Sequence, residues 1–321
     1  MTYTPPPLDP AIALALAADP NAVVGMEPED IPVLRARAVP VREEEVTRYG
    51  TFERTDLRFR SAADDGAPVP VVLLRPVQTS GPLPVIVHIH GGGLVLGGPL
   101  DDLPAALDLA ARTGCAVATI DYRLAPEHPY PTPMLDCYGA LVGLHDAARD
   151  WNLDPTRVVL SGVSAGGGLA AAVGLWARDH DGPDLLGLLL ACPMLDDRNA
   201  TFSAQQMRGV GTWDLTANAT GWRAYLGDAA GGPDVPVYAA PGRAEDLGGL
   251  PPTFVDVASV ETFRDECVAF ADRIWRSGGS AELHVWPGGN HAFDFLAPWA
   301  PLSQDARAAR LAWLRRLLLD A

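Results

Sequence analysis

The chain has 321 residues, of which 48% are hydrophobic and 20% are charged, as is ordinary for a globular protein with a sizeable core. All 24 cationic side chains are arginine, and with 40 acidic residues they give a formal net charge of −16. So acidic a chain without a basic cluster is not expected to bind nucleic acid or an anionic membrane surface.

The first 48 residues predict a peripheral arm. Asp9 and Pro10 are typical of a helix N-cap and first helical position, and the apolar residues after them predict a short helix. No cation precedes this apolar run, because the first is Arg35, and the run is too short to span a bilayer. We therefore expect neither a signal peptide nor stable membrane insertion.

Strands and helices alternate from residue 49 onward. Apolar or alternating runs predict eight strands, at 55–60, 69–77, 82–90, 115–123, 157–162, 185–192, 252–259 and 281–286. Helical patterns occupy 101–112, 132–149, 165–179, 262–277 and 302–319. This alternation predicts an α/β fold, with a mostly parallel eight-stranded sheet and helices on both faces.

A polar, glycine-rich segment at 196–235 interrupts this alternation, and it contains one helical pattern at 215–226. It begins just after a strand, where open α/β sheets accept insertions beside the ligand crevice. The segment predicts either a lid over a site or a plain surface excursion. The core then comprises residues 49–195 and 236–321.

Four cysteines are scattered through the chain without a recognisable spacing. They form neither a C-x-x-C pair nor the spacing of a metal site. We therefore expect free thiols, no metal, and a reducing, cytoplasmic setting.

The pentapeptide 162–166, GVSAG, lies between a predicted strand and a predicted helix. A serine flanked by glycines at such a junction is typical of a nucleophile elbow, where the turn is too sharp for neighbouring side chains. Ser164 is therefore the candidate nucleophile. The alternative is an ordinary Gly/Ser turn, so the remaining motifs have to decide.

An oxyanion hole requires backbone N–H groups that no other group uses. His90 is followed by Gly91, Gly92 and Gly93 directly after a predicted strand, and three glycines allow a backbone that other residues do not tolerate. Together with the N–H of Ala165, the residue after the candidate nucleophile, these glycines predict an oxyanion hole.

A nucleophilic serine also needs a histidine base, which follows the serine in the α/β-hydrolase order. His284 lies inside the last predicted strand, among apolar neighbours. His291 lies just past that strand, where such sheets carry catalytic groups. We therefore predict His291 as the base.

Three carboxylates are candidates for the residue that orients this histidine. Asp256 falls within a predicted strand and Asp265 within the following helix, whereas Glu261 falls in the loop between them. Glu261 is predicted to accept the second ring N–H of His291 and to stabilise the imidazolium. The alternative is a carboxylate that only complements the dipole of the next helix.

These motifs resemble the hormone-sensitive-lipase-like branch of the α/β-hydrolases, the bacterial class IV carboxylesterases. The matching strings are HGGG at 90–93, DYRLAPEHPYP at 121–131, LDPTR at 153–157, GVSAGG at 162–167, LPP at 250–252, FRDE at 263–266 and GGNHAF at 288–293. The resemblance spans about residues 80 to 295 and aligns the family's serine, acid and histidine with Ser164, Glu261 and His291. The family usually has aspartate where this chain has Glu261.

The resemblance implies an α/β-hydrolase fold whose helical cap is built from the N-terminal arm, 1–48, and the insertion, 196–235. It also implies oxyanion donors at Gly92, Gly93 and Ala165, with Gly91 shaping the loop.

The expected function is a serine carboxylesterase acting on a small-molecule ester with a short to medium acyl chain, without a cofactor. Two alternatives stay open: a non-catalytic small-molecule binder on the same fold, and a hydrolase of an amide, a lactone or a biosynthetic ester. The cap tryptophans Trp213 and Trp222 and the nearby Tyr225 fit a pocket wall or a cap core equally well. Homodimer formation is also left open.

Overall fold

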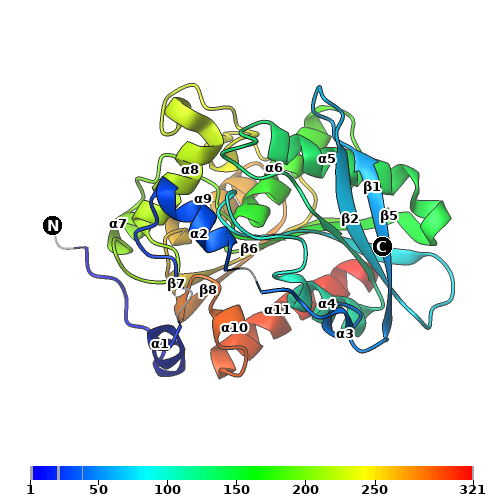
Figure 1. Cartoon of the computed structure of the whole chain (residues 1–321), viewed down its shortest axis with the longest axis horizontal. Helices are drawn as coiled ribbons and strands as arrows, with labels where there is room; N and C mark the ends of the chain where they lie inside the picture. Colours follow the sequence, from blue (N-terminus) through cyan, green and yellow to red (C-terminus); the bar gives the residue numbers. More distant parts are fainter. Residues whose placement is uncertain (1–2, 20–21, 38, 320–321) are drawn as a thin grey trace.

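An eight-stranded sheet runs through the part of the chain that the computed structural model describes, residues 3–19, 22–37 and 39–319 (Figure 1). Its strands are β1 (Phe52–Arg60), β2 (Pro68–Pro76), β3 (Leu83–Ile89), β4 (Ala116–Ile120), β5 (Leu153–Val163), β6 (Gly187–Ala191), β7 (Thr253–Val260) and β8 (Ala281–Asn290). Their order in the sheet is β1-β2-β4-β3-β5-β6-β7-β8. Strand β2 is antiparallel to both of its neighbours and the other pairs are parallel, so the predicted mostly parallel sheet is confirmed.

Helices cover both faces of this sheet. The longer ones are α4 (Leu103–Thr113), α5 (Thr132–Asp146), α6 (Ala165–Asp179), α8 (Leu215–Leu226), α9 (Arg264–Arg276) and α11 (Pro301–Leu319). The shorter ones are α1 (Pro10–Ala17), α2 (Ile31–Arg35), α3 (Glu43–Val46), α7 (Phe202–Gln206) and α10 (Phe293–Leu296). Helices α4 and α11 lie on one face of the sheet, and α5, α6 and α9 lie on the other (Figure 1).

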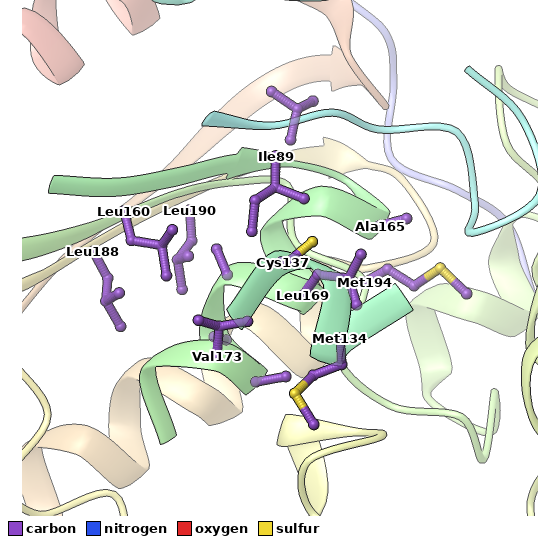
Figure 2. Close-up of a cluster of buried hydrophobic side chains, with 14 of the residues drawn as sticks. Ile89, Met134, Cys137, Leu160, Ala165, Leu169, Val173, Leu188, Leu190 and Met194 are labelled. Atoms are coloured by element: carbon purple, nitrogen blue, oxygen red, sulfur yellow. The ribbon is translucent and has the colours of Figure 1, made fainter. Parts of the chain in front are cut away.

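The two faces follow from the alternation of side chains along each buried strand. In β3, Val85 and Val87 belong to the core under α5 and α6, whereas Ile86 between them belongs to the core under α4 and α11. Both faces are apolar because helices cover both. Figure 2 shows the first of these cores, where Leu160 and Leu190 of the sheet lie beside helical side chains.

The helices predicted at 165–179 and 215–226 match α6 and α8, and the N-cap predicted at Asp9 is confirmed by its side chain, which accepts from Ala11 and Ile12. The last strand is longer than predicted. It continues through Gly288 and Gly289 to Asn290, which pairs with Val260 after a register shift.

The N-terminal arm divides into parts that pack in different places. Helix α1 packs beside β8 and α10, where Ile12 contacts the cluster around Phe293. Further along, the N–H of Val23 donates to the carbonyl of Thr212 at 2.9 Å, and Thr220 Oγ1 donates to the carbonyl of Met26 at 2.8 Å. The middle of the arm therefore lies directly against the insertion.

The four cysteines are all buried free thiols. Within the described ranges, no helix combines the length and the apolar character that crossing a bilayer requires.

Candidate active site

The chain turns sharply at Ser164, between the end of β5 and the start of α6. Its backbone adopts φ 57° and ψ −120°, in the left-handed half of conformational space that side chains normally avoid. The turn brings strand and helix into close contact. A Cβ on Gly162 would lie 2.2 Å from the carbonyl oxygen of Gly166, and a Cβ on Gly166 would lie 2.0 Å from that of Ile89. Both flanking residues therefore have to be glycine.

A continuous hydrogen-bond chain links Ser164, His291 and Glu261. The Ser164 Oγ lies 3.0 Å from His291 Nε2, and His291 Nδ1 lies 3.0 Å from Glu261 Oε1. The side chains come from the ends of β5, β8 and β7, which lie at the carboxyl edge of the sheet. The sequence separates them by up to 127 residues, and the parallel topology brings them together.

The carboxylate of Glu261 is held on both of its oxygens. Its Oε2 accepts the N–H of Ala258 at 2.8 Å while Oε1 faces His291, and the side chain is only 1% exposed. The ring of Phe263 meets the imidazole of His291 edge-on, with centroids 5.1 Å apart. These contacts fix the orientation of both the Glu261 carboxylate and the His291 ring.

The other candidates from the sequence lie apart from this chain. His284 pairs with Glu282 at 2.9 Å on strand β8. Asp256 accepts from Arg310 and Trp286, and Asp265 accepts the N–H of Ser203. Each carboxylate already has its own partners, and Glu261 is the one in contact with His291.

The loop after β3 carries the predicted oxyanion donors. Gly92 has φ 111° and Gly93 has φ 61°, and a Cβ on Gly92 would lie 2.1 Å from the carbonyl oxygen of Leu96. Among the described residues, the N–H groups of Gly92 and Gly93 have no protein acceptor, and the N–H of Ala165 in the first turn of α6 is equally free. Three donors are thus available beside Ser164.

Gly91 differs from the two glycines that follow it. Its N–H donates to Asp102 Oδ2 at 3.0 Å, and its carbonyl accepts from His90 Nδ1 at 2.8 Å. Gly91 therefore shapes the loop rather than offering a free donor. Burial lowers the pKa of His90 to about 4, so its ring is neutral at pH 7 and stacks on Tyr122.

A cavity of about 610 Å³ opens beside Ser164. Its lining is largely apolar, with polar groups towards the N-terminal arm and the loop after β3. The apolar lining residues are Val23, Leu34, Leu96, Leu124, Val163, Trp213, Ala292 and Phe295, and the charged ones are Arg35, Arg37, Asp101 and Asp102. Arg35 is paired with Glu127 and also donates to the carbonyls of Val95 and Ala125.

Among the cap aromatics, Trp213 lines this cavity, whereas Trp222 and Tyr225 are buried in the core. A Cβ on Gly93 would lie 2.2 Å from the Trp213 ring, so the indole packs directly against the oxyanion loop. The carbonyl of Trp213 accepts from Thr262, next to Glu261. The spacing of the three aromatics in the sequence fits a pocket wall and a cap core equally well, so the sequence alone does not distinguish Trp213 from the other two.

One group of donors in the site has the composition of a metal site. Ligand atoms of Cys192, Glu261 and His291 lie within 4.8 Å of one another. Burial raises the pKa of the Cys192 thiol well above its usual range, and the carboxylate and imidazole already bond to each other. A protonated thiol is a poor metal ligand, so the group is better described as a hydrogen-bonded pair beside a thiol.

A serine elbow, an acid and a histidine at the carboxyl ends of the strands of such a sheet, in this order along the chain, define the α/β-hydrolases. A family model described as alpha/beta hydrolase fold matches residues 86–295. The chain is 31% identical over 319 residues to carboxylesterase NlhH of Mycobacterium tuberculosis, and the alignment covers 99% of this chain and 98% of the relative.

Solved structures give the same assignment. A structure titled bacterial heroin esterase superposes with a TM-score of 0.88 at 35% identity, covering 97% of this chain and 98% of the other. Esterase LipW from Mycobacterium marinum superposes with a TM-score of 0.85 at 33% identity, covering 98% and 99%. The chain belongs to the hormone-sensitive-lipase-like α/β-hydrolase family, and it is a carboxylic ester hydrolase.

Proposed function

We propose that this protein is a serine carboxylesterase that hydrolyses neutral esters with short to medium acyl chains. The observation that carries the proposal is the chain of two 3.0 Å contacts from Ser164 through His291 to Glu261. The carboxylesterase NlhH and the esterases named above support the ester as substrate class.

In the proposed acylation step, Ser164 Oγ attacks the ester carbonyl carbon while His291 Nε2 takes the hydroxyl proton. Glu261 stabilises the imidazolium that forms. The negative charge on the former carbonyl oxygen is received by the N–H groups of Gly92, Gly93 and Ala165.

The tetrahedral intermediate then collapses, and the alcohol leaves with the proton from His291. In the second half of the reaction, His291 takes a proton from water, which attacks the acyl-enzyme carbonyl. The acid product leaves and Ser164 is regenerated. No step requires a metal or an organic cofactor.

The cavity supports the proposed substrate size. Its volume of about 610 Å³ lies within the range of about 300–1,000 Å³ typical of small-molecule sites. An apolar wall favours acyl chains, and Trp213 against the oxyanion loop limits the space beside Ser164. We therefore expect activity to fall for long-chain esters.

We further propose that the arm, 1–48, and the insertion, 196–235, form a cap over the core at 49–195 and 236–321. The contact between Val23 and Thr212 joins the two segments, and Val23 and Trp213 both line the cavity. The cap would thus supply the wall that selects the substrate.

The test is hydrolysis of a p-nitrophenyl ester series from acetate to dodecanoate by the wild type and Ser164→Ala. We expect maximal kcat/KM between acetate and octanoate, and a loss of kcat of about 10⁴-fold or more in the variant. A Ser164→Ala protein that keeps substantial hydrolysis would contradict the proposal. A folded wild type without ester hydrolysis would favour the non-catalytic binder or an amide or lactone substrate.

A further inference from the structure

Asp102 occupies the N-cap position of helix α4, yet its side chain does not cap that helix. An aspartate at this position normally accepts a backbone N–H from the first helical turn, which stabilises the helix. Here the carboxylate turns away from α4 towards the loop after β3. Proline at the second helical position removes one N–H group that a cap would bind, and the carboxylate accepts hydrogen bonds elsewhere.

The carboxylate of Asp102 makes two contacts instead. Its Oδ2 accepts the N–H of Gly91 at 3.0 Å, and its Oδ1 lies 2.9 Å from His88 Nε2. The other ring nitrogen of His88 lies 3.4 Å from Ser161 Oγ on β5. All three side chains are buried in the described structure, with Asp102 8% exposed. Serine, histidine and aspartate thus form a second hydrogen-bonded row, beneath the oxyanion loop.

The Asp102 carboxylate is suited to accept both of these bonds. Burial by itself would raise the pKa of Asp102, but the interaction with His88 and the hydrogen bond from Gly91 outweigh burial and lower it. The group is therefore ionised at neutral pH. An ionised carboxylate accepts on both oxygens, as the two contacts require.

Gly91 is the residue through which Asp102 reaches the site. A Cβ on Gly91 would lie 3.5 Å from the Cβ of Ser164, and the next two residues carry the free N–H groups. Asp102 accepts the N–H of Gly91 and His90 donates to its carbonyl, so the peptide units on both sides of Gly91 are held in orientation. The backbone direction entering Gly92 and Gly93 is fixed with it.

We propose that Asp102, oriented by His88, is a positioning residue that holds the oxyanion loop in its productive geometry. Its carboxylate lines the cavity, but its hydrogen bonds go to Gly91 and His88 and not to Ser164 or His291, so it acts through Gly91. This inference rests on the proposed serine mechanism, because an oxyanion hole matters only if a tetrahedral intermediate forms.

Two substitutions separate this role from helix capping. Asp102→Asn keeps the size but has one acceptor for two donors. Asp102→Ser keeps a residue type that is favoured at N-caps, so any capping function of this position is preserved while the Gly91 N–H loses its carboxylate. Asp108→Asn is the matched control, because Asp108 lies on the same helix and its ion pairs in the described part of the chain are with the surface arginines Arg48 and Arg112.

Each variant is assayed for kcat, KM and inhibition by an alkyl trifluoromethyl ketone, which forms an oxyanion on the nucleophilic serine. We expect both Asp102 variants to lose kcat by about 10- to 100-fold, somewhat less than removal of a whole donor, with KM within about twofold. The ketone should bind more weakly by the same factor. Asp108→Asn should match the wild type in all three values.

A folded Asp102→Ser protein with wild-type kcat and ketone affinity would overturn the inference, as would a loss of kcat without a loss of ketone affinity. If Asp102→Asn does not fold, Asp102→Ser decides. Failure of the proposed function itself has a different signature, since the wild type would then neither hydrolyse the ester nor bind the ketone.

Discussion

Replacing Glu261 by glutamine tests how the acid acts on the histidine. The carboxylate accepts from two N–H donors, His291 Nδ1 at 3.0 Å and Ala258 at 2.8 Å, and it is almost fully buried. An amide of the same shape offers one oxygen and one NH₂ group. It cannot satisfy both donors.

Either orientation of the amide is unfavourable. With its oxygen towards Ala258, the NH₂ group faces His291 and selects the tautomer whose Nε2 carries the proton, so the ring cannot accept the proton of Ser164. With its oxygen towards His291, the N–H of Ala258 is left buried without an acceptor, at a cost of about 1–3 kcal/mol. In both cases the negative charge that stabilises the imidazolium is lost.

We therefore expect Glu261→Gln to lower kcat by about 10³- to 10⁴-fold, which corresponds to about 4–5.5 kcal/mol of transition-state stabilisation. KM should change little, because Glu261 does not line the cavity. The assay is stopped-flow hydrolysis of p-nitrophenyl butyrate, in which the acylation burst should slow by the same factor.

The control for removing a carboxylate is Asp272→Asn on helix α9, where Asp272 forms an exposed pair with Arg276. This variant should retain wild-type kinetics. A folded Glu261→Gln protein with more than a tenth of the wild-type kcat would refute the assignment of Glu261 as the orienting acid.

Three further substitutions test other parts of the site. Trp213→Ala should raise the ratio of kcat/KM for octanoate to that for butyrate by about tenfold, because the indole that packs against the oxyanion loop is removed; an unchanged ratio would exclude Trp213 as a size limit. Gly166→Ala should lower the free energy of unfolding in urea by about 1–3 kcal/mol, because its Cβ would lie 2.0 Å from the carbonyl oxygen of Ile89. Gly98→Ala is the control, because a Cβ there meets open space and should leave this free energy unchanged. Folding lowers the pKa of His90 from 6.5 to about 4, so the unfolded chain protonates this ring at a higher pH than the folded chain does. The free energy of unfolding therefore falls as the pH drops from about 6.5 to 4. Between pH 7.5 and 5 the free energy of unfolding of the wild type should fall by about 2 kcal/mol more than that of His90→Asn. Equal decreases in the two proteins would contradict the assigned His90 pKa.

The sheet and the main helices were predictable from the sequence because their signals are local. Buried strands have short apolar runs, and the apolar residues of amphipathic helices recur every three to four residues. The alternation of the two predicts a mostly parallel sheet, whereas the strand order and the antiparallel pairing of β2 were not predicted. The four- and five-residue helices α2, α3, α7 and α10 were not predicted, since one turn of helix has no periodicity. The extension of β8 through Gly288 and Gly289 was missed because glycines normally indicate a turn.

The candidate site was predictable where the backbone itself requires particular residues. The glycines around Ser164 and in the loop after β3 are needed for close approach or for positive φ, so their pattern is visible in the sequence. Asp102 and Trp213 leave no such pattern. Their roles depend on contacts with Gly91 and Gly93, which only the folded chain brings together.

The central claim is that Ser164 is the nucleophile of a working triad, and covalent labelling tests it most directly. The protein is treated with one equivalent of diethyl p-nitrophenyl phosphate, and the adduct is mapped by peptide mass spectrometry. We predict one diethylphosphoryl group per chain, on Ser164, with loss of activity in proportion to labelling and no labelling of His291→Ala. Labelling at another residue, or full activity in a chain labelled at Ser164, would contradict the account.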